Sequence, residues 1–133
     1  MIYVLDSSAM IALANDEPGS DIVELLLTDP QNDCYAHAIN LCEVFYDSYR
    51  RSSEDKALEL IAELRKDVIE RRDLDETFWQ HVGKLKAIHR RVSLADCCAI
   101  ALTLKLSGEL VTSDHHELDA LAAAGVCSIK FFR

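Results

Sequence analysis

The sequence predicts an α/β fold with a short, mainly parallel sheet. Three observations support this prediction. Short apolar segments alternate with helical segments to the end of the chain, half of the residues are hydrophobic, and glycine and proline are scarce, at 4 and 2 residues. Short buried strands of this kind are typical of parallel sheets. A chain of 133 residues can bury its own core, so we expect a single domain over residues 1–133.

The first half of the chain starts with a strand. An apolar, β-branched run stops at Asp6, and Ser8 can cap the helix that follows. Asp29-Pro30 ends the next helix, because a residue before proline avoids helical geometry. Ser52 and Asp55 have the spacing of a capping box and begin another helix. The elements expected here are strands at 2–5 and 34–36, helices at 9–14, 20–27 and 39–51, and a helix with apolar positions at 58, 61, 62 and 64.

The second half continues the alternation. Ser93-Leu94-Ala95-Asp96 is a capping-box start for a very apolar helix that stops at Ser107-Gly108. Asp114 opens the last helix, and Gly125 ends it. The elements expected here are strands at 68–71, 109–112 and 127–131 and helices at 75–88, 94–106 and 114–124.

Composition restricts the compartment and the chemistry. The five cysteines are an odd number without a C-x-x-C pair, which predicts free, buried thiols and gives no zinc-ligand spacing. No apolar run approaches the about 20 residues that span a bilayer, and the first residues lack the basic and small-residue features of a signal peptide. We therefore expect a cytoplasmic protein.

Four acids are placed where a ligand site of a parallel sheet lies. Asp6 and Asp114 follow strands, and ligands bind outside the carboxyl ends of strands. Asp96 and Glu43 lie in the first turns of helices, within apolar stretches where an unpartnered charge is costly. Each acid by itself also fits a cap, an Asx-turn or an exposed position. A divalent cation shared by several carboxylates would satisfy them together.

These residues resemble the PIN-domain nucleases and, within them, the VapC-like toxins of toxin-antitoxin pairs. The resemblance spans nearly the whole chain, and it depends on the order and spacing of four segments that are individually unspecific. They are Val4-Leu5-Asp6-Ser7-Ser8-Ala9, Asn40-Leu41-Cys42-Glu43, Ser93-Leu94-Ala95-Asp96 and Leu110-Val111-Thr112-Ser113-Asp114.

The resemblance implies a three-layer α/β/α sandwich and an endoribonuclease that leaves a 5′-phosphate. Its metal ligands are expected to be Asp6, Glu43, Asp96 and Asp114, supported by Thr112, Ser7 and Asn40. Mg²⁺ suits such an all-oxygen site, and Mn²⁺ is a plausible substitute. The resemblance also implies a homodimer and a small antitoxin partner. Where relatives often have an aromatic residue after the last acid, this chain has His115-His116-Glu117-Leu118-Asp119, in which a histidine or a later acid could add a metal contact, although surface exposure is favoured for the histidines.

The net charge of −9 is unusual for an enzyme that binds nucleic acid. Metal ions would neutralise part of it. The basic residues are also concentrated in one segment that leads into the Asp96 helix, and they either guide RNA or form an ordinary solvated helix face. They are Lys84, Lys86, His89, Arg90 and Arg91.

Other functions remain open at this level. Asp6 after a first strand also suits an aspartyl-phosphate enzyme, but a second nearby aspartate and a well-placed lysine are missing. The fold could also serve as a stand-alone nuclease, as a nuclease that prefers DNA, or as a catalytically silent interaction domain. The presence of all four acids disfavours the silent domain.

Overall fold

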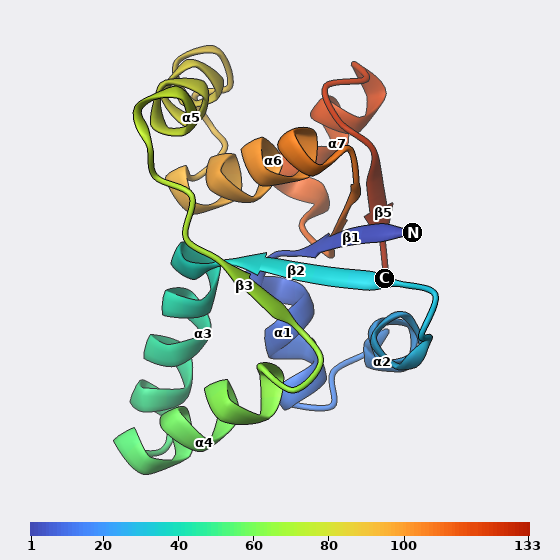
Figure 1. The fold of residues 1–133 in the computed structure, drawn as a ribbon, viewed down its shortest axis with the longest axis vertical. Coiled ribbons are helices and arrows are strands. Elements are labelled where there is room, and N and C mark those ends of the chain that lie inside the picture. The colour runs from blue at the N-terminus through green and yellow to red at the C-terminus, as the bar shows by residue number, and fades with distance from the viewer.

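The computed structural model describes residues 1–133 and contains five strands and seven helices (Figure 1). Its elements are β1 (Ile2–Leu5), α1 (Ser7–Ala14), α2 (Ser20–Thr28), β2 (Asp33–His37), α3 (Ala38–Arg51), α4 (Glu54–Leu64), β3 (Ile69–Arg71), α5 (Glu76–Ile88), α6 (Leu94–Leu106), β4 (Glu109–Thr112), α7 (His115–Ala123) and β5 (Ile129–Phe131). The predicted alternation of strands and helices is confirmed.

The sheet forms the middle of three layers. All neighbouring strands are parallel, in the order β3-β2-β1-β4-β5. Helices α1 to α4 cover one face, and α5 to α7 cover the other (Figure 1). The predicted α/β/α sandwich is therefore confirmed, and its sheet is entirely parallel.

Both faces of the sheet are buried, which explains why its strands are apolar. In β1, Leu5 packs into the core beneath α1 to α4, whereas Val4 packs into the core beneath α5 to α7. In β4, Val111 and Leu110 divide in the same way. This division follows from the alternation of side chains along a strand.

The strand order reverses between β1 and β4. From β1 the chain builds outward through β2 and β3, and it then returns to add β4 and β5 on the other side. In an open parallel sheet, ligands bind outside the carboxyl ends of the strands at such a switch point. Asp6 and Asp114 follow the two strands that border it.

Two expected helix caps were wrong by one or two residues. Asp6, not Ser8, caps α1, because its carboxylate accepts from the backbone N–H of Ala9. Ser53, not Ser52, caps α4 and accepts from the N–H of Lys56. In both cases several neighbouring residues can serve as caps, and the path of the chain selects one of them.

The last strand and one cysteine differ slightly from expectation. The last strand covers Ile129–Phe131 and is shorter than predicted. All five cysteines are free, and four are buried, but Cys42 is exposed on α3. No helix is long and apolar enough to cross a membrane.

Candidate metal-binding active site

Asp6 is the most buried acid at the switch point, with 2% of its surface exposed. One of its oxygens, Oδ1, accepts from the Ser8 hydroxyl at 2.6 Å and from the N–H of Ala9 at 3.0 Å. The other, Oδ2, accepts from the Thr112 hydroxyl at 2.5 Å. Every bond is made within the end of β1, the start of α1 and the end of β4. The carboxylate is therefore held rigidly.

Thr112 and Ser8 connect the two strand ends. The Thr112 hydroxyl accepts from the N–H of Asp114 at 3.0 Å while it donates to Asp6. The Ser8 hydroxyl accepts from the N–H of Ser113 at 3.1 Å. Thr112 thus lies beside the acids as predicted. Ser8 supports Asp6 through these hydrogen bonds, whereas the supporting role expected of Ser7 stays a prediction.

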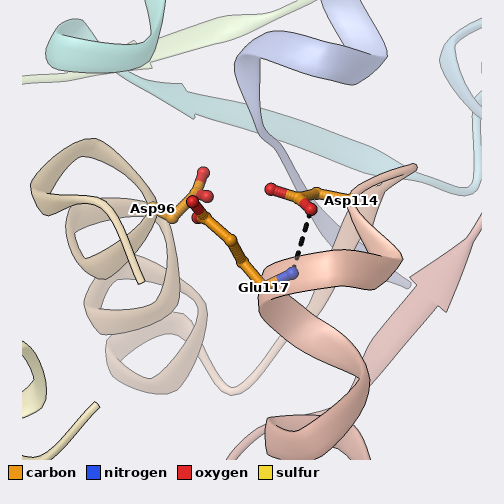
Figure 2. A group of neighbouring side chains, drawn as sticks. All are labelled: Asp96, Asp114 and Glu117. Carbon is orange, nitrogen blue, oxygen red and sulfur yellow. Dashed lines mark hydrogen bonds between the residues drawn. The ribbon is translucent and has the colours of Figure 1, made fainter. Parts of the chain in front are cut away.

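Three carboxylates meet beside these strand ends (Figure 2). One oxygen each of Asp96, Asp114 and Glu117 lies within 4.8 Å of the others. Asp96 comes from the first turn of α6, Asp114 caps α7, and Glu117 lies in the first turn of α7. Asp114 accepts from the N–H of Glu117 at 3.1 Å, and Glu117 accepts from the N–H of Ser93 at 3.2 Å. Two helix N-termini therefore position this group, which we call the acid triad.

The electrostatics of the acid triad favour a bound cation. Burial is the main reason that the pKa of Asp96 rises to about 8, and its hydrogen bond with Glu117 and the charges of Asp6, Glu117 and Asp114 add to the rise. Burial also raises the pKa of Asp6 to about 6, although its hydrogen bonds oppose the rise. None of these carboxylates forms an ion pair with a side chain of the protein.

Two of the predicted acids, Asp6 and Glu43, lie outside the triad. The charge of Asp6 still acts on Asp96, whereas Glu43 stands apart. It lies half-buried on α3 and is not part of the group of oxygens within 4.8 Å. Its Oε1 atom faces the Nδ2 atom of Asn40 at 3.5 Å, and the same Nδ2 donates to the carbonyl of Ala95 at 3.3 Å. Ala95 directly precedes Asp96. Asn40 therefore connects Glu43 to α6, the helix that carries Asp96.

Glu117 was not among the four predicted ligands, although a later acid had been left open as a metal contact. Its position three residues after Asp114 is the available signal, because a capping residue and its third neighbour lie side by side at a helix start. That spacing is common at helix starts. Only the approach of α6 to α7 shows that Glu117 meets Asp96.

The histidines after Asp114 do not join the acids. The ring of His115 stacks on Phe131 at 4.1 Å between centroids. Its Nδ1 atom contacts Asp119 at 2.8 Å and its Nε2 atom contacts the carbonyl of Arg133 at 2.7 Å. Both histidines are exposed, in agreement with the expectation.

The basic segment covers the last turns of α5 and the turn that leads into α6. Nine of the 14 lysines and arginines form an ion pair with an acid, and the other five are Lys84, Lys86, Arg90, Arg91 and Lys130. The Lys86 ammonium donates to the carbonyls of Arg90 and Val92, at 2.9 and 2.7 Å. Lys86 thus fixes the turn, whereas Lys84, Arg90 and Arg91 are exposed and unpaired.

The donor set of the site fits a hard divalent cation. All the candidate ligands are carboxylate oxygens, and they come from the ends of β1 and β4, from the first turns of α6 and α7, and from Glu43 further along α3. Mg²⁺ and Mn²⁺ prefer such ligands. A cation would replace the proton held by Asp96 and would remove the repulsion within the triad.

Comparison with known structures agrees with this geometry at the level of the fold. The chain is similar to VapBC-1 from nontypeable Haemophilus influenzae (TM-score 0.74, 22% identity, 99% of this chain and 98% of that chain covered). It is similar to a toxin-antitoxin complex from Klebsiella pneumoniae (TM-score 0.72, 15% identity, 98% of both chains). It is also similar to Mycobacterium tuberculosis VapC20, described as a Sarcin-Ricin loop cleaving toxin (TM-score 0.71, 19% identity, 90% and 95%).

The sequence itself carries the family assignment. No curated protein matches the chain at a significant level. The family model described as PIN domain, in contrast, matches residues 3–124, which is most of the chain and includes every acid of the site. The protein therefore belongs to the PIN domain family.

Proposed function

We propose that this protein is a metal-dependent endoribonuclease of the VapC type, the toxin of a toxin-antitoxin pair. One observation carries the proposal: three carboxylates lie within 4.8 Å of one another at the switch point of a parallel sheet, without a lysine or arginine among them. A protein gains no stability from such an arrangement unless a cation completes it.

The proposed ligands are Asp6, Glu43, Asp96 and Asp114, with Glu117 as a fifth carboxylate. Asp6 is held by three hydrogen bonds and fixes one side of the site. Asp96, Asp114 and Glu117 supply the converging oxygens. Thr112 donates to Asp6, and Asn40 lies beside Glu43, as expected of supporting residues. Mg²⁺ is the proposed ion, and Mn²⁺ the proposed substitute.

The proposed reaction is hydrolysis of an RNA phosphodiester. A bound Mg²⁺ would lower the pKa of a water and polarise the phosphate. The protein contributes by holding the carboxylates in place and by carrying unpaired cations on the segment that leads to the Asp96 helix. Exposed Arg90 and Arg91 lie on the turn that leads into α6, and Lys84 lies one helical turn before Ile88 on α5. We propose that these three residues bind RNA phosphates.

The test is cleavage of labelled RNA by the purified protein with Mg²⁺, with Mn²⁺ and with EDTA, and with DNA of the same sequence as a comparison. We expect cleavage of RNA that requires metal and is lost in Asp6→Asn and Asp96→Asn. Thermal unfolding of each variant establishes that it is folded. Cleavage that persists in EDTA, or in a folded Asp96→Asn protein, would contradict the proposal.

The proposed partner is a small antitoxin, encoded separately, and the proposed assembly is a homodimer. Several similar structures are described as VapBC or toxin-antitoxin complexes. An acidic protein of net charge −9 suits a basic antitoxin segment. Co-purification with the product of the neighbouring small gene tests the partner, and light scattering tests the dimer. A monomer that retains no small protein would favour a stand-alone nuclease.

A further inference from the structure

Asn40 is the polar side chain whose surroundings the fold alone does not explain. It is fully buried in the first turn of α3, with 0% of its surface exposed. Its Oδ1 atom is the one buried side-chain nitrogen or oxygen that has no hydrogen-bond partner. Leaving a buried acceptor unsatisfied costs about 1–3 kcal/mol. An apolar residue of similar size would avoid this cost.

The other end of the Asn40 amide joins two elements of the acidic site. Its Nδ2 atom lies 3.5 Å from Oε1 of Glu43, one turn along α3, and 3.3 Å from the carbonyl of Ala95. Exchanging the amide oxygen and nitrogen would place two acceptors opposite each other, so these neighbours fix the orientation of the amide. The amide is the side chain that hydrogen-bonds both to Glu43 and to the helix bearing Asp96.

We propose that Asn40 is a positioning residue that holds Glu43 toward the metal site, at the expense of stability. This inference rests on the proposed function, and it identifies how Glu43 is recruited to the site. Glu43 is half-buried and has no cationic partner. Without the Nδ2 donor, its side chain is free to turn into solvent. Residues that orient metal ligands typically change metal affinity by about 10- to 100-fold when replaced.

The decisive variant is Asn40→Leu, which keeps the approximate size and removes the amide. We expect its Mn²⁺ dissociation constant to rise about tenfold. We expect its free energy of unfolding in EDTA to stay the same or to increase. Two reasons support this. The Ala95 carbonyl still accepts the backbone hydrogen bond of its own helix, and the substitution removes the Oδ1 atom that has no partner. A purely structural role predicts the opposite pattern, a loss of stability with unchanged Mn²⁺ affinity.

Thr103→Val is the matched control. Thr103 is also buried and polar, lies on α6, and donates to the carbonyl of Ala99 at 2.8 Å. It has no contact with the acids, so its replacement should leave Mn²⁺ affinity unchanged. Equal losses of affinity in both variants would mean that any buried change in the core disturbs the site, and the proposal would be overturned.

A double-mutant cycle shows whether Asn40 acts through Glu43. In a Glu43→Gln protein, Asn40→Leu should cause little further loss of Mn²⁺ affinity, because the residue that it positions has already lost its charge. Losses that simply add would overturn the proposal even if Asn40→Leu folds poorly. A wild-type protein that binds no Mn²⁺ would instead contradict the proposed function, which separates the two failures.

Discussion

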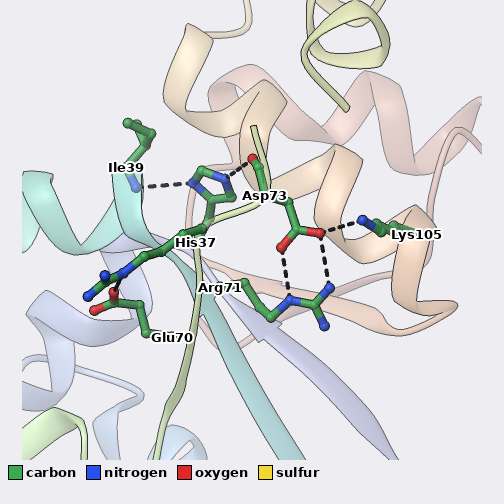
Figure 3. A network of polar contacts seen from close by, with 7 residues as sticks. His37, Ile39, Glu70, Arg71, Asp73 and Lys105 are labelled. Atoms are coloured by element: carbon green, nitrogen blue, oxygen red, sulfur yellow. Dashed lines mark hydrogen bonds and ion pairs between the residues drawn. The ribbon is translucent and has the colours of Figure 1, made fainter. Parts of the chain in front are cut away.

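Two largely buried aspartates of this protein have opposite surroundings. Asp73, in the connection between β3 and α5, has 9% of its side chain exposed, and Asp96 has 8% of its surface exposed. Asp73 is bound by Arg71 through both oxygens, at 2.9 and 3.0 Å, and by Lys105 at 2.5 Å (Figure 3). The charged groups that act on Asp96 are all carboxylates, and two of them, Asp114 and Glu117, are drawn in Figure 2.

The pKa of each aspartate reports this difference. The hydrogen bond from Arg71 is the largest reason that the pKa of Asp73 lies below its usual range. Burial is the largest reason that the pKa of Asp96 lies above its usual range. At Asp73 the hydrogen bonds and charges of Arg71 and Lys105 outweigh the effect of burial, whereas no cation offsets burial at Asp96. A carboxylate that pairs with lysine or arginine side chains stabilises the fold. A carboxylate without such a partner is available to bind a cation from solution.

The network of Asp73 also has a clear structural use. Its main-chain carbonyl accepts from Nε2 of His37, whose Nδ1 atom accepts from the N–H of Ile39 and so caps α3 (Figure 3). The His37 ring stacks on Phe78 of α5 at 5.4 Å. The network therefore connects the ends of β2 and β3 to α3, α5 and α6. Nothing in it is left unpaired for a ligand.

The largest expected effect is on catalysis. Asp96→Asn should reduce RNA cleavage by more than about 100-fold, because it removes a metal ligand rather than a residue that orients one. Asp73→Asn should keep most of the activity, since Asp73 contacts only the structural network. Initial cleavage rates at saturating Mg²⁺ measure both. If Asp96→Asn and Asp73→Asn are both folded and lose activity equally, the proposed distinction between the two aspartates is wrong.

The second expected effect is on stability. Here Asp73→Asn, not Asp96→Asn, should be the damaging substitution. Asp73→Asn should lower the free energy of unfolding by about 1–2 kcal/mol, because charged hydrogen bonds are lost, but Arg71 and Lys105 are partly exposed and can be solvated. Asp96→Asn should raise it at neutral pH in EDTA, since the amide is neutral in both states and avoids the cost of protonating the wild-type carboxyl well above its unfolded pKa. Urea unfolding of the three proteins provides the values. A more destabilised Asp96→Asn protein would reverse the comparison.

The third expected effect is the dependence on pH. The pKa of Asp96 rises from 3.8 to about 8 on folding, so the stability gained by keeping it protonated is complete below pH 3.8 and is lost as the pH rises to about 8. Asp6 contributes in the same direction, up to about pH 6. Asp73 contributes oppositely, because its lowered pKa stabilises the fold above pH 3.8 and this contribution is lost in acid.

Metal should therefore stabilise the protein more at higher pH, where protons no longer compete for the acids. We expect the rise in Tm caused by Mg²⁺ to be larger near pH 8 than near pH 5.5. In Asp96→Asn the rise should be small at both values. Thermal unfolding with Mg²⁺ and with EDTA measures the difference, and a Mg²⁺ effect that does not change with pH would argue against binding at these carboxylates.

The smallest expected effect concerns the cations that pair with no acid. Replacing Arg90 and Arg91 together by Ala should reduce the slope of log K for RNA binding against log salt concentration, by the amount that corresponds to about two phosphate contacts. The control is Lys56→Ala with Lys66→Ala, whose ammonium groups already pair with Glu59 and Glu63. Binding is measured over a range of salt concentrations in an Asp96→Asn background, which prevents cleavage. Unchanged slopes in the test variant would identify the basic turn as an ordinary solvated surface.

The elements and three of the acids illustrate how far the sequence leads. The alternation of apolar strands with capped helices predicts the sandwich, because burial on both faces of a sheet requires apolar strands. Asp6, Asp96 and Asp114 follow strands or begin helices, and their place at the switch point follows from the topology. Their predicted role as metal ligands stays a prediction that the variants above will test.

Other features could not be read locally. Three of them depend on how neighbouring elements pack. They are the capping of α1 by Asp6 rather than Ser8, the hydrogen bond from Ser8 to Asp6, and the exposure of Cys42. In the sequence, Lys86 is grouped with the basic residues that either guide RNA or face solvent. In the structure its ammonium donates to the carbonyls of Arg90 and Val92. In each case residues of similar propensity compete, and contacts with distant elements decide between them.

The sequence by itself determined the parallel α/β architecture and the placement of acids at its element ends, because both follow from local patterns of burial and capping. The tertiary structure decided which acids meet. Glu117 joins Asp96 because α7 approaches α6, Glu43 stays apart from the triad on α3, and Asp73 receives Arg71 and Lys105 from distant segments. Electrostatic interactions fall off with distance and depend on burial, so only the folded arrangement distinguishes a neutralised carboxylate from one that needs a cation.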